Sequence, residues 1–198
     1  MSRLGIFGGT FDPVHVGHLA IASAALESVP LDRVLFVPAK RSPLKDRLPL
    51  ASEADRLTML EAAIAGEPRF SVSRAELERE GPSYTADTLE RLAGRVEQDQ
   101  LFLILGGDAV VDFERWHRPD RIVQLATLLV AARPGAPDPV EGERRLVFDA
   151  PRLDISSREL RARALRGRSL RYLVPDAVWR HIEEHGLYRA METTPRTT

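Results

Sequence analysis

A strand, a glycine turn and the start of a helix are predicted within residues 5–19, and this stretch constrains the fold more than any other. An apolar run of strand character ends at Phe7, and two glycines follow it directly. A helix that begins after such a turn brings several backbone N–H groups together, where they can bind phosphate. His15 and His18 lie at the same point and add side-chain donors that can carry positive charge. The stretch therefore indicates phosphate chemistry at a junction between a strand and a helix.

Apolar runs of strand length alternate with helical patterns along the chain. Strands are predicted at residues 4–7, 34–37, 70–73, 101–105, 127–131 and 145–148. Helices are predicted from Val16, after a Ser52 cap to Gly66, at 85–95, around 122–125, from Ser156 or Ser157, and from Pro175 to Gly186. Continuous apolar strands that alternate with helices predict an α/β fold, with a single doubly wound, mostly parallel sheet of Rossmann-like type and helices on both faces.

One domain is predicted over residues 1–189, followed by a flexible polar tail at 190–198. Two proline-bearing segments, 39–51 and 133–143, have the composition of surface loops. The first of these loops is basic and follows the second strand, which makes it a candidate for closing over a substrate.

The composition is that of an ordinary soluble protein and excludes several function classes. The net charge of −1 argues against a general nucleic-acid binder. With 0 cysteines there is no disulfide framework, thiolate nucleophile or cysteine zinc site. No apolar run approaches the ~20 residues that a membrane span needs. We therefore expect a cytoplasmic protein with neither a nucleic acid nor a membrane as its partner.

Polar residues and glycines follow four of the predicted strands. Because ligands of doubly wound sheets bind beyond the carboxyl ends of the strands, these residues are expected at one edge. They are residues 8–18 after the first strand, Lys40 and Lys45 after the second, 106–108 after the fourth, and Ser156 and Ser157 after the last.

Each of these features also has a purely structural alternative. One histidine could cap the helix while the other packs, the glycine pair could form only a tight turn, and Trp116 could belong to the core. The glycines match neither the GxGxxG fingerprint nor a phosphate-binding loop with Gly-Lys-Ser/Thr. There is no HExxH pattern, so a zinc site is not expected here.

Several segments together resemble the HxGH nucleotidyltransferase superfamily, and within it the bacterial nicotinate-nucleotide adenylyltransferases. The resemblance runs from about residue 3 to residue 188. It is carried by Gly8–Pro13 with His15–His18, by Gly81–Leu89 (GPSYTADTL), by Gly106–Asp108 with Trp116, by Ile155–Arg161 (ISSRELR), and by the closing segments 172–175 and 186–188.

This resemblance implies that the phosphate of nicotinate mononucleotide attacks the α-phosphorus of ATP and that pyrophosphate leaves. A phosphate monoester is mostly ionised at pH 7, because its second pKa is about 6, so the nucleophile needs no general base. The enzyme must instead hold two anions together and stabilise the charge that develops on them. Histidines, lysine, arginine and helix N-termini suit that task.

The resemblance also implies a role for individual residues. The expected catalytic residues are His15, His18, Lys45 and Arg161. ATP is expected to contact Gly8, Gly9, Thr10, Phe11, Gly17, His18, Gly106, Asp108, Ile155, Ser156, Ser157 and Arg161. The mononucleotide is expected to contact Gly9, Thr10, Lys45, Tyr84, Thr85 and Trp116, with Trp116 as a stacking surface for the pyridine ring. Mg²⁺ is expected on the ATP phosphates, with no metal site in the protein.

Two positions depart from the family pattern. Leu44 stands where the family often has a histidine, and Arg158 replaces the threonine of its ISSTxIR signature. Three alternatives stay open: the same chemistry on nicotinamide mononucleotide, the same chemistry on phosphopantetheine, or a non-catalytic nucleotide-binding regulatory module. A homo-oligomer is possible.

Overall fold

The computed structural model describes residues 2–41, 43, 48–94, 100–132 and 144–189. Lys45, the loop 133–143, the end of the helix predicted at 85–95 and the tail 190–198 lie outside the described residues. The backbone of Asp108 is described but its side chain is not.

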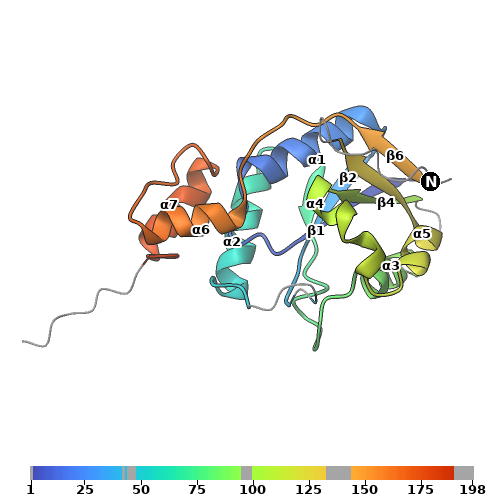
Figure 1. The fold of residues 1–198 in the computed structure, drawn as a ribbon, viewed down its shortest axis with the longest axis horizontal. Coiled ribbons are helices and arrows are strands. Elements are labelled where there is room, and N and C mark those ends of the chain that lie inside the picture. The colour runs from blue at the N-terminus through green and yellow to red at the C-terminus, as the bar shows by residue number, and fades with distance from the viewer. Residues whose placement is uncertain (1, 42, 44–47, 95–99, 133–143, 190–198) are drawn as a thin grey trace, which may run out of the picture.

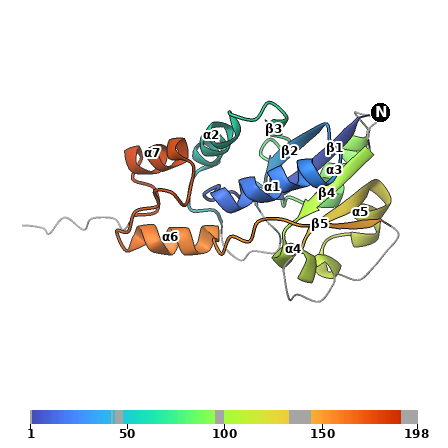
Figure 2. The same ribbon diagram turned by 90° about the horizontal axis from the view of Figure 1, so that it is seen from above.

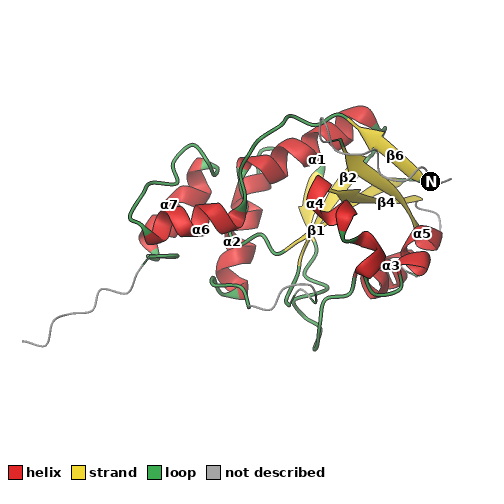
Figure 3. Cartoon of the chain, viewed as in Figure 1, coloured by secondary structure: helices red, strands yellow, loops and turns green. Residues whose placement is uncertain are grey.

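Six parallel strands form one sheet in the order β3-β2-β1-β4-β5-β6. Figures 1 and 3 show the sheet with helices around it. Every pairing between neighbours is parallel, with Gly5 beside Val34 and Phe102, for example. The strands are β1 (Arg3–Gly9), β2 (Arg33–Pro38), β3 (Phe70–Val72), β4 (Gln100–Leu105), β5 (Ala126–Ala131) and β6 (Arg145–Phe148). The predicted doubly wound parallel sheet is confirmed.

Helices connect the strands much as predicted. They are α1 (Val16–Ser28), α2 (Glu53–Ile64), α3 (Thr85–Ala93), α4 (Gly107–Val111), α5 (Pro119–Leu125), α6 (Ser157–Leu165) and α7 (Asp176–Glu184), with a 3₁₀ turn η1 at Phe113–Arg115. The predicted caps are present, since Ser52 accepts a hydrogen bond from the backbone of Asp55 and Ser156 accepts one from Glu159. The ends of α2 and α7 fall two residues earlier than predicted.

Alternate residues of the strands pack against helices on opposite faces of the sheet. Phe102 and Ile104 of β4 join a core cluster that includes α1, α2, α6 and α7. Leu101 and Leu103, one residue out of phase, join a second cluster with α3 and α5. Figure 1 shows α1 on one side of the strands and α3 and α5 on the other. Burial on both faces explains why Leu101–Leu105 of β4 is apolar without interruption.

The C-terminal helices α6 and α7 lie beyond the end of the sheet in both views, with α7 beside α2 (Figures 1 and 2). α7 packs directly against α2. Across the described ranges, no helix has the length and apolar character that a membrane crossing requires.

Candidate functional site

A cavity of about 560 Å³ opens at the carboxyl ends of β1 and β4. β1 pairs with β2 on one side and β4 on the other, so the strand order changes direction between β1 and β4. Ligands of doubly wound sheets bind at such a switch point. The predicted residues that line this cavity are Gly8, Gly9, Thr10, Tyr84, Thr85, Gly106 and Trp116.

One wall of the cavity is aromatic. The rings of Tyr84 and His117 lie 4.3 Å apart between centroids at 33°, and the half-buried Trp116 packs against Phe113. The indole N–H of Trp116 is buried, and no described residue accepts a hydrogen bond from it. The wall therefore offers flat surfaces and one polar group to a planar ligand. Thr85 is the first residue of α3, so backbone N–H groups at this helix start lie at the cavity.

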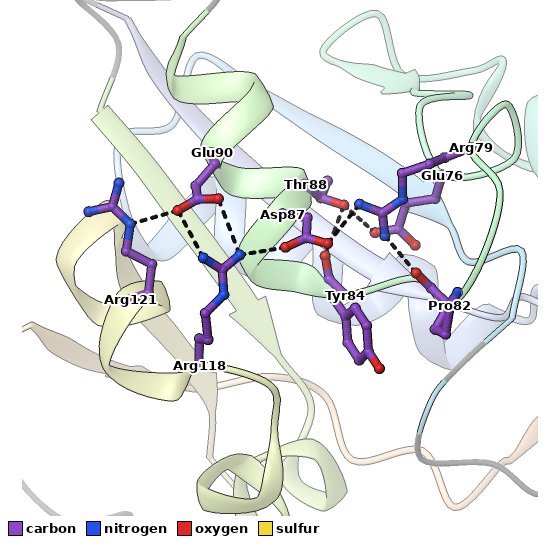
Figure 4. Close-up of polar contacts among 9 residues, drawn as sticks. All are labelled: Glu76, Arg79, Pro82, Tyr84, Asp87, Thr88, Glu90, Arg118 and Arg121. Carbon is purple, nitrogen blue, oxygen red and sulfur yellow. Dashed lines mark hydrogen bonds and ion pairs between the residues drawn. The ribbon is translucent and has the colours of Figure 1, made fainter.

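Ion pairs anchor this wall to α3 (Figure 4). Asp87 accepts hydrogen bonds from Arg79 at 3.0 Å and from Arg118 at 2.5 Å. The carboxylate of Glu90 accepts hydrogen bonds from Arg118 and Arg121. Arg118 lines the cavity and has a positive φ of 53°. Partly exposed pairs contribute little stability each. The pairs of Arg118 link α3 to the segment that carries the aromatic wall.

Glu76 is a buried cavity residue that the sequence analysis missed. Its carboxyl group accepts a hydrogen bond from Thr88 at 2.6 Å, and it also lies against the side chain of Ser83 (Figure 4 shows its bond to Thr88). Burial raises the pKa of Glu76, while the hydrogen bonds from Thr88 and Ser83 oppose that rise. Ser83 in turn accepts a hydrogen bond from the backbone of Lys40, so this group ties the α3 entry to the end of β2.

His15 and His18 stack on each other at the start of α1, with ring centroids 3.7 Å apart. The backbone N–H of His15 donates to Nδ1 of His18 at 3.2 Å. Because Nδ1 accepts, the hydrogen of a neutral His18 ring lies on Nε2. Phe11 supports this ring edge-on, with centroids 5.0 Å apart.

His15 differs from the expected cationic donor. Only 6% of it is exposed, and burial lowers its pKa to about 4. The ring is therefore neutral near pH 7 in the free protein. Gly17 accommodates it, because a Cβ on Gly17 would lie 3.0 Å from Nδ1 of His15. This close approach gives the glycine of the HxGH pattern a steric reason.

The start of α6 lies against the turn that precedes α1. Ser157 donates to the carbonyl of Pro13 at 2.9 Å, and Arg161 donates to the carbonyl of Asp12 at 2.6 Å. The carbonyl of Ile155 would lie 3.9 Å from a Cβ on Gly17. Residues from two distant segments of the predicted ATP site are thereby brought together.

Further predicted ATP contacts also have protein partners or are covered. The hydroxyl of Ser156 bonds with the backbone and the carboxylate of Glu159. Phe11 is buried, and its ring lies so close to Gly9 that a Cβ there would be 2.9 Å from it. A ligand would meet the main chain of Phe11, not its side chain.

Asp12 is the centre of a buried polar cluster. It is 2% exposed and accepts hydrogen bonds from the backbones of Leu50 and Ala51 and from the hydroxyl of Tyr188 at 2.8 Å. Arg161 lies 3.7 Å from its second oxygen. The cluster joins the turn before His15 to α6 and to the segment after α7.

A fully buried arginine holds the ends of β1 and β2. One nitrogen of Arg56 donates at 2.8 Å to the carbonyls of both Thr10 and Ala39. Burial lowers the pKa of Arg56, and the Asp12 carboxylate opposes that effect. The sequence held a signal for this residue, because Arg56, Leu60 and Ile64 share one helical face.

Comparison with known sequences identifies close relatives. The chain matches the family model described as Cytidylyltransferase-like over residues 6–163. A protein of Thermus thermophilus, named "Probable nicotinate-nucleotide adenylyltransferase", is 49% identical over 187 residues, covering 94% of this chain and 100% of its own length. A protein of the same name from Thermomicrobium roseum is 42% identical over 212 residues, covering 100% of this chain and 99% of its own.

Solved structures of low identity share the fold. The nicotinic acid mononucleotide adenylyltransferase of Plasmodium falciparum complexed with APC superposes with a TM-score of 0.77 at 17% identity, covering 95% of this chain and 98% of the other. The same enzyme complexed with NaAD gives a TM-score of 0.76 at 18% identity, with the same coverage.

Proposed function

Since the chain belongs to the Cytidylyltransferase-like family, and within it to the bacterial nicotinate-nucleotide adenylyltransferases, we propose that its site joins the AMP part of ATP to nicotinate mononucleotide. The products are nicotinate adenine dinucleotide and pyrophosphate, in the biosynthesis of NAD. The observation that carries this proposal is the placement of the aromatic cavity beside the His15–His18 turn, both at the carboxyl edge of β1.

The mononucleotide occupies the cavity in this proposal. Its pyridine ring stacks on Trp116, and its carboxylate meets the backbone N–H groups at the start of α3, near Tyr84 and Thr85. A helix N-terminus favours an anion over a neutral amide, which supports the acid as substrate. Lys45, outside the described residues, stays a proposed contact of the substrate phosphate.

ATP extends from the cavity edge across the starts of α1 and α6. Gly8, Gly9 and Thr10 bind phosphate through their main chain, and His18 donates from Nε2. Ser156, Ser157 and Arg161 bind the β- and γ-phosphates, with Ile155 and Gly17 forming the floor. Gly106 and Asp108 bind the ribose. Phe11 contributes through its main chain.

The reaction is an in-line displacement. An ionised oxygen of the mononucleotide phosphate forms a bond to the α-phosphorus, the bond from that phosphorus to the bridging oxygen breaks, and its electron pair leaves with pyrophosphate. No proton must be removed from the nucleophile. His18 and Arg161 donate to the oxygens on which negative charge grows, and the neutral His15 holds its neighbour in place by stacking.

Mg²⁺ enters with ATP as part of the substrate. Among the described residues that line the cavity, Glu76 supplies the single carboxylate, and Thr88 already bonds to it. Such a donor set suits an ion carried by phosphate oxygens and water better than an ion held in a protein cage.

We also infer a single domain over residues 1–189, a flexible tail at 190–198 and a cytoplasmic location without nucleic-acid partners. The count of zero cysteines supports the cytoplasmic location, and the net charge of −1 supports the absence of nucleic-acid partners. A homo-oligomer is proposed without a defined interface.

Pyrophosphate release by the purified protein with Mg-ATP tests the function. Nicotinate mononucleotide, nicotinamide mononucleotide and phosphopantetheine are offered in parallel. We expect strong preference for the nicotinate form. Preference for another acceptor would overturn the substrate, and no release with any of the three would favour the regulatory module.

A further inference from the structure

Two histidines and an aspartate come together far from the nucleotide cavity. His181 and His185 lie four residues apart on α7 and at its C-terminal cap, with ring centroids 4.1 Å apart. Asp55 of α2 faces them, and its Oδ1 lies 3.0 Å from Nε2 of His181. One ligand atom from each of the three residues lies within 4.8 Å of the others. None of them lines the cavity.

From this juxtaposition we propose that Asp55, His181 and His185 bind one divalent ion of the Zn²⁺ class, which joins α2 to α7. Two imidazole nitrogens and one carboxylate oxygen are a donor set that Zn²⁺ accepts and that Mg²⁺ does not favour. The site is therefore distinct in chemistry from the Mg²⁺ that accompanies ATP.

The orientation of His185 suits a ligand. Its Nδ1 lies 3.0 Å from the carbonyl oxygen of His181, which can only accept, so the hydrogen of a neutral ring lies on Nδ1. The lone pair is then on Nε2. A backbone carbonyl that receives the other ring N–H is the usual support of a metal-bound histidine.

The distances require only a small adjustment. Donors at about 2.0–2.2 Å from a tetrahedral zinc lie roughly 3.3 Å from one another. The atoms of Asp55 and His181 are already 3.0 Å apart, and a ligand atom of the exposed His185 lies within 4.8 Å of both, so a small shift of α7 against α2 completes the set. When the ion binds, the hydrogen between His181 and Asp55 moves to Nδ1 of His181 or to solvent. Water completes the coordination.

The carboxylate is prepared for this role by its own helix. A hydrogen bond from Ser52 is the main cause that lowers the pKa of Asp55, so the group is anionic at neutral pH. The next residue, Arg56, holds the ends of β1 and β2, and Tyr188 after α7 bonds to Asp12. An ion here would therefore stabilise the supports of the nucleotide site without touching it.

Binding of Zn²⁺ to the full chain without a purification tag, after treatment with a chelator, tests the proposal. We expect one Zn²⁺ per chain by titration calorimetry and a rise in Tm of about 5–10 °C at a free Zn²⁺ concentration 100-fold above Kd. The same concentration of Mg²⁺ should leave Tm unchanged. No binding of Zn²⁺ at micromolar concentration would overturn the proposal.

Variants locate the ion. His185→Gln removes an exposed ligand at the helix end and should weaken Zn²⁺ binding by about 100-fold or more, and Asp55→Asn should weaken it about tenfold or more. Glu184→Gln, which removes the adjacent exposed carboxylate, is the matched control and should bind as the parent does. Unchanged affinity in His185→Gln and Asp55→Asn, or loss only when His15 or His18 is replaced, would place the ion elsewhere and refute the site.

Discussion

The hydroxyl of Tyr188 is a single oxygen whose removal tests how the C-terminal segment supports the turn before α1. It donates at 2.8 Å to Oδ1 of Asp12, and Tyr188 is only 9% exposed. Burial, and then the negative charge of Asp12, raise the pKa of this hydroxyl, so it stays a donor even in alkaline solution. Tyr188→Phe deletes the bond and keeps the packing of the ring.

The loss of stability expected for Tyr188→Phe depends on the hydrogen bonds that Asp12 retains. A hydrogen bond to a charged acceptor contributes about 1.5–3 kcal/mol. After the substitution, Asp12 still accepts from the backbones of Leu50 and Ala51, so its charge is not left without donors. We therefore expect the free energy of unfolding to fall by about 2 kcal/mol, which lowers Tm by roughly 4–8 °C in a chain of this size.

Urea denaturation provides the measurement, with the midpoint shifted and the slope m unchanged. Tyr172→Phe is the matched control, because Tyr172 is 82% exposed, and it should change stability by less than about 0.5 kcal/mol. A double-mutant cycle with Asp12→Asn should show a coupling of about 1 kcal/mol or more. If Tyr188→Phe is as stable as Tyr172→Phe, the argued bond contributes nothing.

Four further substitutions address the site. His18→Ala should keep the fold by circular dichroism and lower kcat by about 10²–10³-fold, and near-normal turnover would contradict its role at the transition state. Trp116→Ala should raise the mononucleotide KM about tenfold or more while the ATP KM changes little, whereas equal changes would remove the stacking role. Gly17→Ala should lower kcat by roughly 10- to 100-fold, because the new Cβ would displace the His15 ring. The control Gly66→Ala, at a position with open space around it, should leave kcat unchanged. A fully active Gly17→Ala enzyme would show that the His15 ring tolerates displacement. The pKa of His15 is about 4 in the folded protein and 6.5 in the unfolded chain. As the pH drops from 6.5 to 4, the unfolded chain is protonated at this residue while the folded protein is not. The free energy of unfolding therefore falls across this range, by about 3 kcal/mol in total. His15→Gln should remove that part of the pH dependence of urea midpoints, and identical pH profiles would refute the shift.

Local patterns predicted the sheet because the central strands are largely buried on both faces and largely apolar, whereas the edge strands β3 and β6 are more exposed. β4, for example, is predicted at 101–105 and observed at Gln100–Leu105. α4 and η1 were not predicted, because helices of five and three residues are too short to show a helical period.

Charged and long-range contacts were beyond the same reasoning. Arg56 shares a helical face with the buried Leu60 and Ile64, but a search for apolar residues alone passes over a charged residue at such a position. Asp55 and His181 are separated by 126 positions, so only the fold brings them together. Glu76 lies in a turn outside any regular element, and its burial depends on the packing of α3.

The bond between Asp12 and Tyr188 spans 176 positions of the chain, and it sets an order of events during synthesis. At translation rates of about 5–20 residues per second, the segment that contains Asp12 is made roughly 10–35 s before its last partner. A nascent chain that still lacks α7 and Tyr188 therefore has the histidine turn but not the bond that secures it. The histidine turn, although made early, is therefore secured only after a segment 176 positions later has been made.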